Sequence, residues 1–279
     1  MKLLDTFAGI GGFSYAAEKL VGGFETTQFI EINPYCQKVL NKHWSHVPIH
    51  DDITTFTAKS GEFDIITGGF PCQDLSYAGK GLGITKETRS GLFYELIRVI
   101  RMVRPKYVVL ENVAAILNRG LDIVLRELYE AGYDAEWAVI SASSLGACHQ
   151  RSRWWLVAYP KSQSSNGSEL RPAFNKKSSV SKSGNCNIKS SNPNSERLQG
   201  LRGEYELQES CKERTFTWRN SGITLNPNWK GYKSKPTLCR GDDGLSNRVD
   251  RLKALGNSVV PQVAAIPLQR VKDLYATAS

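Results

Sequence analysis

Hydrophobic residues in the first 160 positions occur in short runs that polar, glycine-containing turns separate. Short β-branched runs predict buried strands, and apolar residues spaced three or four apart predict amphipathic helices. The two patterns alternate, which is typical of a doubly wound α/β domain. The expected strands are residues 2–7, 25–30, 62–67, 106–110, 134–140 and 154–158, with one more short strand before Asp51. The expected helices are 14–20, 34–44, 91–100, 117–131, 248–255 and 259–275.

The pattern changes after Pro160. Residues 161–195 are crowded with Ser, Asn and Lys and have almost no apolar periodicity, so they predict long loops. Aromatic residues return among basic ones in 214–219 and 226–232. We therefore expect a small, irregular domain over 161–245, inserted into a Rossmann-like domain that comprises 1–160 and 246–279.

The distribution of charge along the chain suggests a binding partner. The net charge is +9, and residues 161–245 hold 15 Lys and Arg against 8 Asp and Glu, so they carry +7 of it. A basic segment beside a balanced body favours a polyanion, with nucleic acid first, although a solvated basic surface is the alternative.

The sequence also indicates where in the cell the protein is located. No apolar run approaches the roughly 20 residues of a membrane span, and the N-terminus lacks the apolar region of a signal peptide. We expect a cytoplasmic protein without membrane contact. The six cysteines form no Cys-x-x-Cys pair, so we expect neither a metal site nor a disulfide framework.

Polar groups follow the first three predicted strands. The first strand leads into a glycine-rich turn, Gly9 to Gly12, whose G-x-G-G pattern is a weak form of the nucleotide-binding fingerprint. Glu31 ends the second strand, where such folds place an acid on ribose hydroxyls. Asp51 and Asp52 follow the third. Because these positions recur at successive strand ends, they predict a cofactor crevice.

The fourth strand ends in Gly68-Gly69-Phe70-Pro71-Cys72. The glycines allow a sharp turn and Pro71 stiffens it, so that Cys72 is displayed as a candidate nucleophile. An ordinary half-buried cysteine is the alternative. The next residues, Gly79 to Ser90, are rich in Gly, Lys and Thr, which suggests a mobile lid.

Two later strands bring further charged groups. Glu111 follows the strand at 106–110, and Arg151 and Arg153 precede the strand at 154–158. In an extended chain, residues two apart share a face, so the two guanidiniums should lie side by side with an anion or carboxylate between them. A cysteine, a carboxyl group and paired arginines suit attack on an electron-poor pyrimidine.

With these residues in view, the chain resembles the DNA (cytosine-5)-methyltransferases of bacteria and phages. The resemblance covers most of 1–160 and 246–279. The matching pieces, in the order of the family, are Asp5–Gly12, Pro71-Cys72-Gln73, Glu111-Asn112-Val113, Arg151-Ser152-Arg153, and Arg251 with Gly256–Pro261.

The resemblance implies a reaction. Cys72 would add to C6 of a flipped-out cytosine in a specific duplex DNA sequence, while Glu111 protonates N3. Carbon 5 would then take a methyl group from S-adenosylmethionine. Arg153 and Arg151 would hold the base oxygen and support the catalytic loop.

The resemblance also implies a cofactor site. Phe7 would pack on adenine, Glu31 would bind the ribose hydroxyls, and Asp52 would accept from the adenine amino group, with Asp51 as the alternative one residue away. Gly9 and Gly11 would line the methionine end of the cofactor, and Asn257 would contact the same end. The 161–245 segment matches the family's target-recognition region in position.

Two positions depart from the family pattern. Cys148 stands where the family often has Pro, and it is most simply a core residue. His149 stands where the family often has Gln, and it could either tune the site or be a structural histidine.

Other functions stay open at this point. An RNA cytosine methyltransferase could use the same residues, a thymidylate-synthase-like enzyme also attacks pyrimidine C6, and a catalytically dead DNA-binding protein would keep the basic segment. We expect a monomer acting on duplex DNA. A cognate restriction endonuclease could act on the same site without direct contact, or the enzyme could guard a phage genome or act alone.

Overall fold

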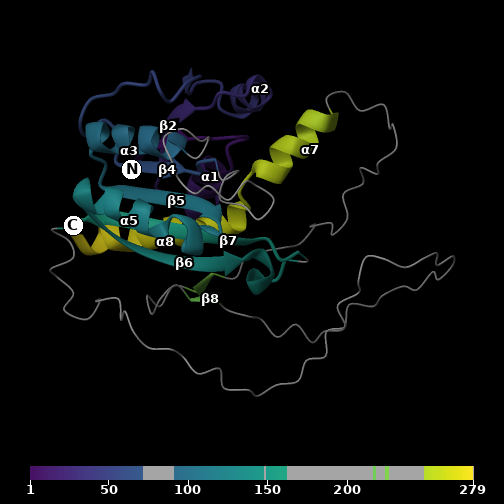
Figure 1. Cartoon of the computed structure of the whole chain (residues 1–279). Helices are drawn as coiled ribbons and strands as arrows, with labels where there is room; N and C mark the ends of the chain where they lie inside the picture. Colours follow the sequence, from purple (N-terminus) through teal and green to yellow (C-terminus); the bar gives the residue numbers. More distant parts are fainter. Residues whose placement is uncertain (72–90, 148, 162–215, 218–223, 226–247, 279) are drawn as a thin grey trace, which may run out of the picture.

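The fold is built on one mixed sheet, seen in a computed structural model that describes residues 1–71, 91–147, 149–161, 216–217, 224–225 and 248–278 (Figure 1). Its seven strands are β1 (Lys2–Thr6), β2 (Glu25–Ile30), β3 (Ile49–His50), β4 (Ile65–Gly68), β5 (Tyr107–Val113), β6 (Tyr133–Ser141) and β7 (Ser152–Pro160). Their order across the sheet is β3-β2-β1-β4-β5-β7-β6. Strands β3, β2, β1, β4 and β5 are parallel, whereas β7 runs antiparallel to both β5 and β6.

Both faces of the sheet are buried, which explains the continuous apolar runs in its strands. Neighbouring residues point to opposite faces: Leu4, Ile66 and Leu110 belong to one core, and Leu3 and Ile65 to the other. The fold is therefore the doubly wound α/β type that the alternating pattern predicts.

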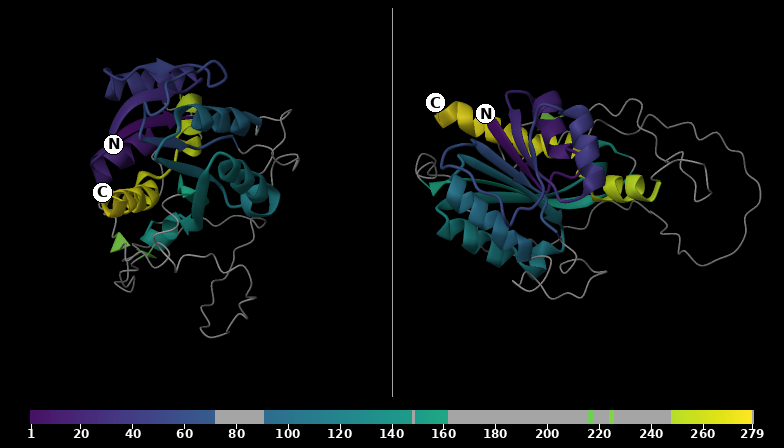
Figure 2. Two further views of the ribbon diagram at one scale, coloured as in Figure 1. Left: turned by 90° about the vertical axis from the view of Figure 1, so that its left-hand side faces the viewer. Right: turned by 90° about the horizontal axis from the view of Figure 1, so that it is seen from above.

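Helices cover the two faces in separate groups (Figures 1 and 2). On one face lie α3 (Leu92–Val103), α4 (Ile116–Arg119) and α5 (Leu121–Glu130). The other face is covered by α1 (Gly12–Tyr15), the π-helix η1 (Ala16–Val21) and α8 (Pro261–Ala278). Helix α2 (Pro34–His43) packs beside β2 through Leu40 and Trp44.

The remaining elements are short or project from this body. The 3-10 helix η3 (Ala142–Leu145) follows β6, and α7 (Arg248–Asn257) extends away from the sheet before the chain turns into α8 (Figure 1). Strands β8 (Phe216–Thr217) and β9 (Thr224–Leu225) form a separate antiparallel pair. None of the helices that the structure describes is long and apolar enough to cross a membrane.

Local sequence signals fix several boundaries. Asn33 caps α2 through its side-chain oxygen, which accepts from the backbone N–H groups of Tyr35 and Cys36, and Pro34 occupies the first helical position. Strand β2 spans the residues that the pattern predicts. The helix expected over 117–131 is instead broken at Gly120, and the one expected over 14–20 becomes a four-residue α-helix followed by a π-helix.

Three expectations fall outside the described residues. They are the nucleophile Cys72, the lid over Gly79 to Ser90, and nearly all of the proposed second domain at 161–245. The described chain stops at Pro71 on one side of the first gap and resumes at Gly91 on the other.

Candidate active site

A cavity lies at the carboxyl ends of the parallel strands, close to where the strand order reverses between β1 and β4. Ligands of doubly wound sheets bind at this position because diverging crossover connections leave a crevice there. The cavity has a volume of about 290 Å³. Its lining includes seven of the predicted site residues, Phe7, Gly9, Glu31, Glu111, Arg151, Arg153 and Asn257.

One wall is formed by the turn after β1. Phe7 and Gly9 both have positive φ, 53° and 56°, so the chain doubles back at once. The backbone N–H of Gly9 donates to Oε2 of Glu31 at 2.6 Å, and that of Asn33 donates to Oε1 at 2.8 Å. Each carboxylate oxygen is thus fixed by one backbone group, and its other lone pairs remain for a ligand.

This wall fits an adenosyl group. A Cβ placed on Gly9 would meet nothing within 4 Å, so the turn leaves open space where a side chain would stand. Phe7 offers an apolar ring, and Glu31, a buried acceptor at the end of β2, suits a pair of hydroxyl groups. The residues present therefore match the cofactor that the sequence predicts.

The opposite wall carries Glu111 and Arg153. Strand β5 continues through Glu111 to Val113, so Glu111 belongs to the strand and does not follow it. Because β7 is antiparallel, its first residues lie at the carboxyl end of β5, and Arg153 pairs with Val113. Arg153 is thus a diagonal neighbour of Glu111, and its Nε lies 3.0 Å from Oε1 of Glu111.

Burial changes the acid–base behaviour of Glu111. Only 9% of the residue is exposed, and desolvation raises the pKa of its carboxyl group to about 7, although Arg153 and Arg151 act to lower it. A Cβ on Gly69 would lie 3.3 Å from the second carboxyl oxygen, Oε2, so glycine leaves room beside that atom. Glu111 can therefore hold or release a proton near neutral pH.

Arg151 does not sit as the extended-chain interpretation predicts. Its φ is 29°, and β7 begins only at the next residue, so the two arginines do not share a strand face. Both terminal nitrogens of Arg151 donate to the carbonyl of Gly256 at 3.0 Å, and Nη2 also donates to that of Ser258 at 2.5 Å. Arg151 thus fixes both neighbours of Asn257, the last residue of α7.

Asn112 has a role that the sequence reasoning missed. Its side-chain nitrogen donates to the carbonyl oxygen of Phe70 at 3.2 Å, and its side-chain oxygen accepts from the N–H of Val113. Phe70 and Pro71 line the cavity directly before Cys72. In the sequence, only the position of Asn112 next to Glu111 in the family motif indicates that it belongs to the site.

A thiol on α2 lines the cavity as well. Cys36 is buried in α2, and burial, with a further contribution from Glu31, raises the pKa of its thiol to about 11. At neutral pH this thiol stays protonated and is a poor nucleophile.

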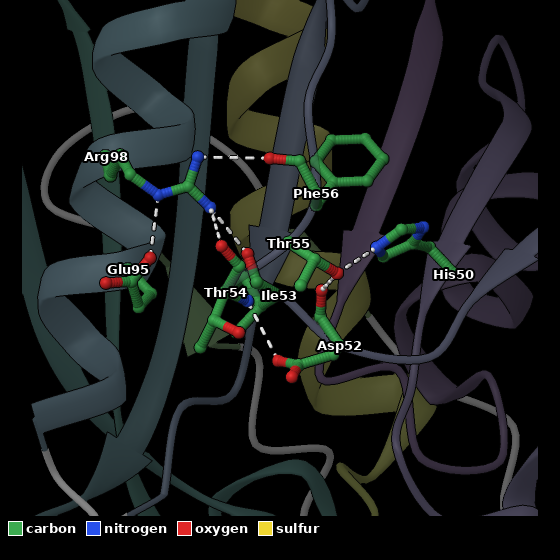
Figure 3. A network of polar contacts seen from close by, with 8 residues as sticks. All are labelled: His50, Asp52, Ile53, Thr54, Thr55, Phe56, Glu95 and Arg98. Carbon is green, nitrogen blue, oxygen red and sulfur yellow. Dashed lines mark hydrogen bonds and ion pairs between the residues drawn. The ribbon is translucent and has the colours of Figure 1, made fainter.

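Four candidate residues lie apart from this cavity. Gly11 and His149 line a larger hollow of about 980 Å³, and a Cβ on Gly11 would lie 2.6 Å from the ring of Trp44. Asp52 belongs to a turn after β3, where its Oδ1 accepts from the N–H of Thr54 at 2.9 Å, which lowers the pKa of Asp52 (Figure 3). Asp51 is exposed.

Asp5 supports the glycine turn from behind. It is fully buried and accepts from the hydroxyl groups of Ser14 and Thr67, both at 2.8 Å. Desolvation raises the pKa of Asp5 to about 7 against the opposing effect of these hydrogen bonds. The bond to Ser14 joins the end of β1 to α1, which fixes the turn between them.

Comparison with known proteins agrees with this geometry. The family model of the C-5 cytosine-specific DNA methylases matches residues 1–241. The chain belongs to this family. Among curated methylases, it is 37% identical over 163 residues to the type II methyltransferase M.CviJI of Paramecium bursaria Chlorella virus IL3A, covering 57% of this chain and 43% of that protein. It is 32% identical over 189 residues to M.NgoBV of Neisseria gonorrhoeae, covering 62% and 44%.

The chain thus spans less than half the length of these curated relatives. A solved structure of the Entamoeba histolytica methyltransferase EhMeth matches with a TM-score of 0.50 and 17% identity over 63% of this chain and 55% of that chain. At this identity the match shows a shared fold and nothing more.

Proposed function

We propose that this chain methylates carbon 5 of a flipped-out cytosine in a specific sequence of duplex DNA, with S-adenosylmethionine as the methyl donor. The observation that carries the proposal is that two walls face the same cavity. Phe7 and Glu31 lie on one wall, and Glu111 and Arg153 lie on the other. An adenosyl group and a pyrimidine bound on these walls would meet between them. Membership in the methylase family supports the same assignment.

Glu111 and Arg153 are assigned to the base. Glu111, whose pKa lies at about 7, can donate a proton to N3 of cytosine, which makes C6 more electrophilic. Arg153 holds the Glu111 carboxyl group and offers its remaining N–H groups to the base oxygen.

Cys72 is assigned as the nucleophile. Its thiolate would form a bond to C6, and the electron pair of the C5–C6 bond would make C5 nucleophilic. After C5 has accepted the methyl group, loss of the C5 proton and expulsion of the thiolate restore the aromatic base. Asn112 supports this step by fixing the carbonyl of Phe70, two residues before Cys72.

Phe7, Gly9, Glu31 and Asn257 are assigned to the cofactor. S-adenosylmethionine, when bound, supplies the methyl group that C5 accepts. Glu31 takes the ribose hydroxyls with the lone pairs that its backbone donors leave open. Asp52 in the turn after β3 and Gly11 in the glycine turn are also assigned to the cofactor. Arg151, which the family resemblance places at the base oxygen and the catalytic loop, is assigned instead to the cofactor side because it binds the carbonyls on either side of Asn257.

Residues 161–245 are assigned to target recognition. Their share of the net charge, +7 of +9, suits contacts to DNA phosphates. Because the target carbon lies inside the stacked duplex, the base must leave the helix to reach a cavity of this kind. We propose that the protein acts as a monomer in the cytoplasm of a bacterial or phage-infected cell, with a cognate restriction endonuclease as a candidate partner at the same site.

Covalent trapping tests the proposed nucleophile. Duplex DNA with 5-fluorocytosine at the target position should form a stable adduct with the protein in the presence of S-adenosylmethionine, because fluorine cannot leave as a proton does. The adduct should vanish in Cys72→Ala and persist in the matched control Cys186→Ala. No adduct with the wild-type protein would favour a DNA-binding protein without catalysis.

The substrate class is tested by labelled methyl transfer. We expect label in duplex DNA and none in tRNA, and the reverse result would make the chain an RNA methyltransferase. Bisulfite sequencing of DNA from cells that express the chain then gives the recognition sequence.

A further inference from the structure

Arg98 on α3 holds together the turn that contains Asp52 (Figure 3). Its Nη1 donates to the carbonyl of Phe56 at 3.0 Å, and its Nη2 donates to that of Ile53 at 2.6 Å and, more weakly, to that of Thr54 at 3.3 Å. One guanidinium thus binds three backbone carbonyls of the same turn. We call residues 52–56 the Asp52 turn.

The guanidinium is itself held in place. Its Nε donates to Oε2 of Glu95, one helical turn earlier on α3, at 2.7 Å. Ile53 and Phe56 anchor the same turn by burying their side chains against the core that α3 covers. The planar fork of an arginine suits such a set of acceptors, whereas a lysine has a single nitrogen.

The Asp52 turn is also connected to Glu31. The hydroxyl group of Thr55 lies 2.9 Å from Nε2 of His50 and donates to the carbonyl of Asp52 at 3.1 Å. The carbonyl of His50 in turn accepts from the backbone N–H of Glu31 at 2.9 Å. The backbone groups of Glu31 and Asp52, the two acids assigned to the adenosine, are therefore linked through His50 and Thr55, and Arg98 binds the same turn from the side of α3.

We propose that Arg98 is a positioning residue for the cofactor, which fixes the Asp52 turn so that Asp52 accepts from the amino group of adenine. This inference rests on the proposed function. Arg98 acts only through the turn, so its loss should weaken recognition of the adenine amino group and leave the base chemistry at Glu111 intact.

Calorimetric binding of two ligands to the full chain tests this role. S-adenosylhomocysteine carries the 6-amino group, and S-inosylhomocysteine has an oxo group in its place. The wild-type protein should prefer the amino ligand. In Arg98→Ala, affinity for S-adenosylhomocysteine should fall about tenfold and the preference should largely disappear. In methyl transfer, KM for S-adenosylmethionine should rise while kcat stays near that of the wild type.

Two variants serve as controls. Arg101→Ala removes an arginine from the same helix, one that pairs with Glu127 and Glu130, and should leave both affinities unchanged. Arg98→Lys retains the charge and a single donor group, so the preference for the amino ligand should fall only in part. If Arg98→Ala does not fold, Arg98→Lys carries the test.

The outcomes are distinct. A folded Arg98 variant that keeps the wild-type affinity and the preference for the amino ligand overturns the inference. A wild-type protein that binds both ligands equally also overturns it, while the proposed function stands. A wild-type protein that binds neither ligand contradicts the proposed function itself.

Discussion

Glu111 and Arg153 form an ion pair across two hydrogen-bonded strands, with 3.0 Å between Oε1 of the acid and Nε of the guanidinium. The pair exists because β7 runs against β5, which brings the first residues of one strand to the last residues of the other. An arginine at the start of a parallel strand would lie at the opposite edge of the sheet. The antiparallel strand thus provides the acid with its partner.

Glu111→Gln should abolish proton donation while it keeps the shape of the side chain. We expect kcat for methyl transfer to fall by a factor of about 10²–10⁴, the usual contribution of a general acid. Binding of S-adenosylhomocysteine, measured by calorimetry, should change little because the adenosine wall is separate. A variant with wild-type kcat would remove Glu111 from the mechanism.

Arg153→Ala should shift the pH dependence of catalysis. The Arg153 charge lowers the pKa of Glu111, so its loss moves that pKa upward from about 7. Since protonated Glu111 is the active form, the alkaline limb of kcat/KM should move to higher pH while the rate drops. Arg153→Lys, which keeps the charge, should leave the limb near its wild-type position. An alkaline limb that stays in place in the alanine variant contradicts the assignment.

Arg151→Ala should act on the cofactor side. Without the guanidinium, the carbonyls of Gly256 and Ser258 lose their donor and Asn257 loses its fixed position. We expect affinity for S-adenosylhomocysteine to fall about tenfold, an effect similar to that of Asn257→Ala, and the double variant should lose little more. Fully additive losses would show that the two residues act independently.

Asp5→Asn should change how stability depends on pH. Burial raises the pKa of Asp5 to about 7 from an ordinary value of 3.8, so the folded protein keeps a proton that the unfolded chain releases between these values. This contribution to stability is complete below pH 4 and is lost as the pH rises toward 7. From pH 5 to pH 8, the melting temperature should therefore fall less in Asp5→Asn than in the wild type. Equal slopes in thermal melts would contradict the raised pKa.

Gly68→Ala should destabilise the end of β4. A Cβ there would lie 2.6 Å from Oγ1 of Thr6, whose hydroxyl donates to the carbonyl of Thr67. We expect a loss of about 1–3 kcal/mol in the free energy of unfolding, measured by urea denaturation. Gly256→Ala is the matched control, because a Cβ at that position meets nothing within 4 Å. A Gly68 variant as stable as the control would mean that Thr6 moves away without cost.

The sequence predicts the parts of this fold that depend on local signals. Strand β2 and the cap of α2 follow from β-branched residues and from Asn33 before Pro34. The family motifs also predict most of the cavity, because residues at the ends of parallel strands meet at one edge of the sheet. Glycine is a weak helix former, but the apolar pattern continues through Gly120, so the sequence predicts one helix where the structure has two.

The remaining features depend on contacts between distant segments. Nothing near Arg151 in the sequence predicts its positive φ or its partner Gly256, which lies 105 residues away. Arg98 occupies an ordinary polar position of an amphipathic helix, and only the packing of α3 beside the Asp52 turn gives it three carbonyls. The periodicity of apolar residues carries no information on such contacts between distant segments.

The base side and the adenine side of the proposed site differ in how they can open. Glu111 and Arg153 lie on paired strands inside the sheet, whose amides exchange with solvent only when a large part of the domain unfolds. Asp52 belongs to a short turn that α3 holds through the Arg98 guanidinium and through the packing of Ile53 and Phe56. Transient opening of that turn would free the adenosine end of a spent cofactor while the acid and its arginine stay in register for the next base.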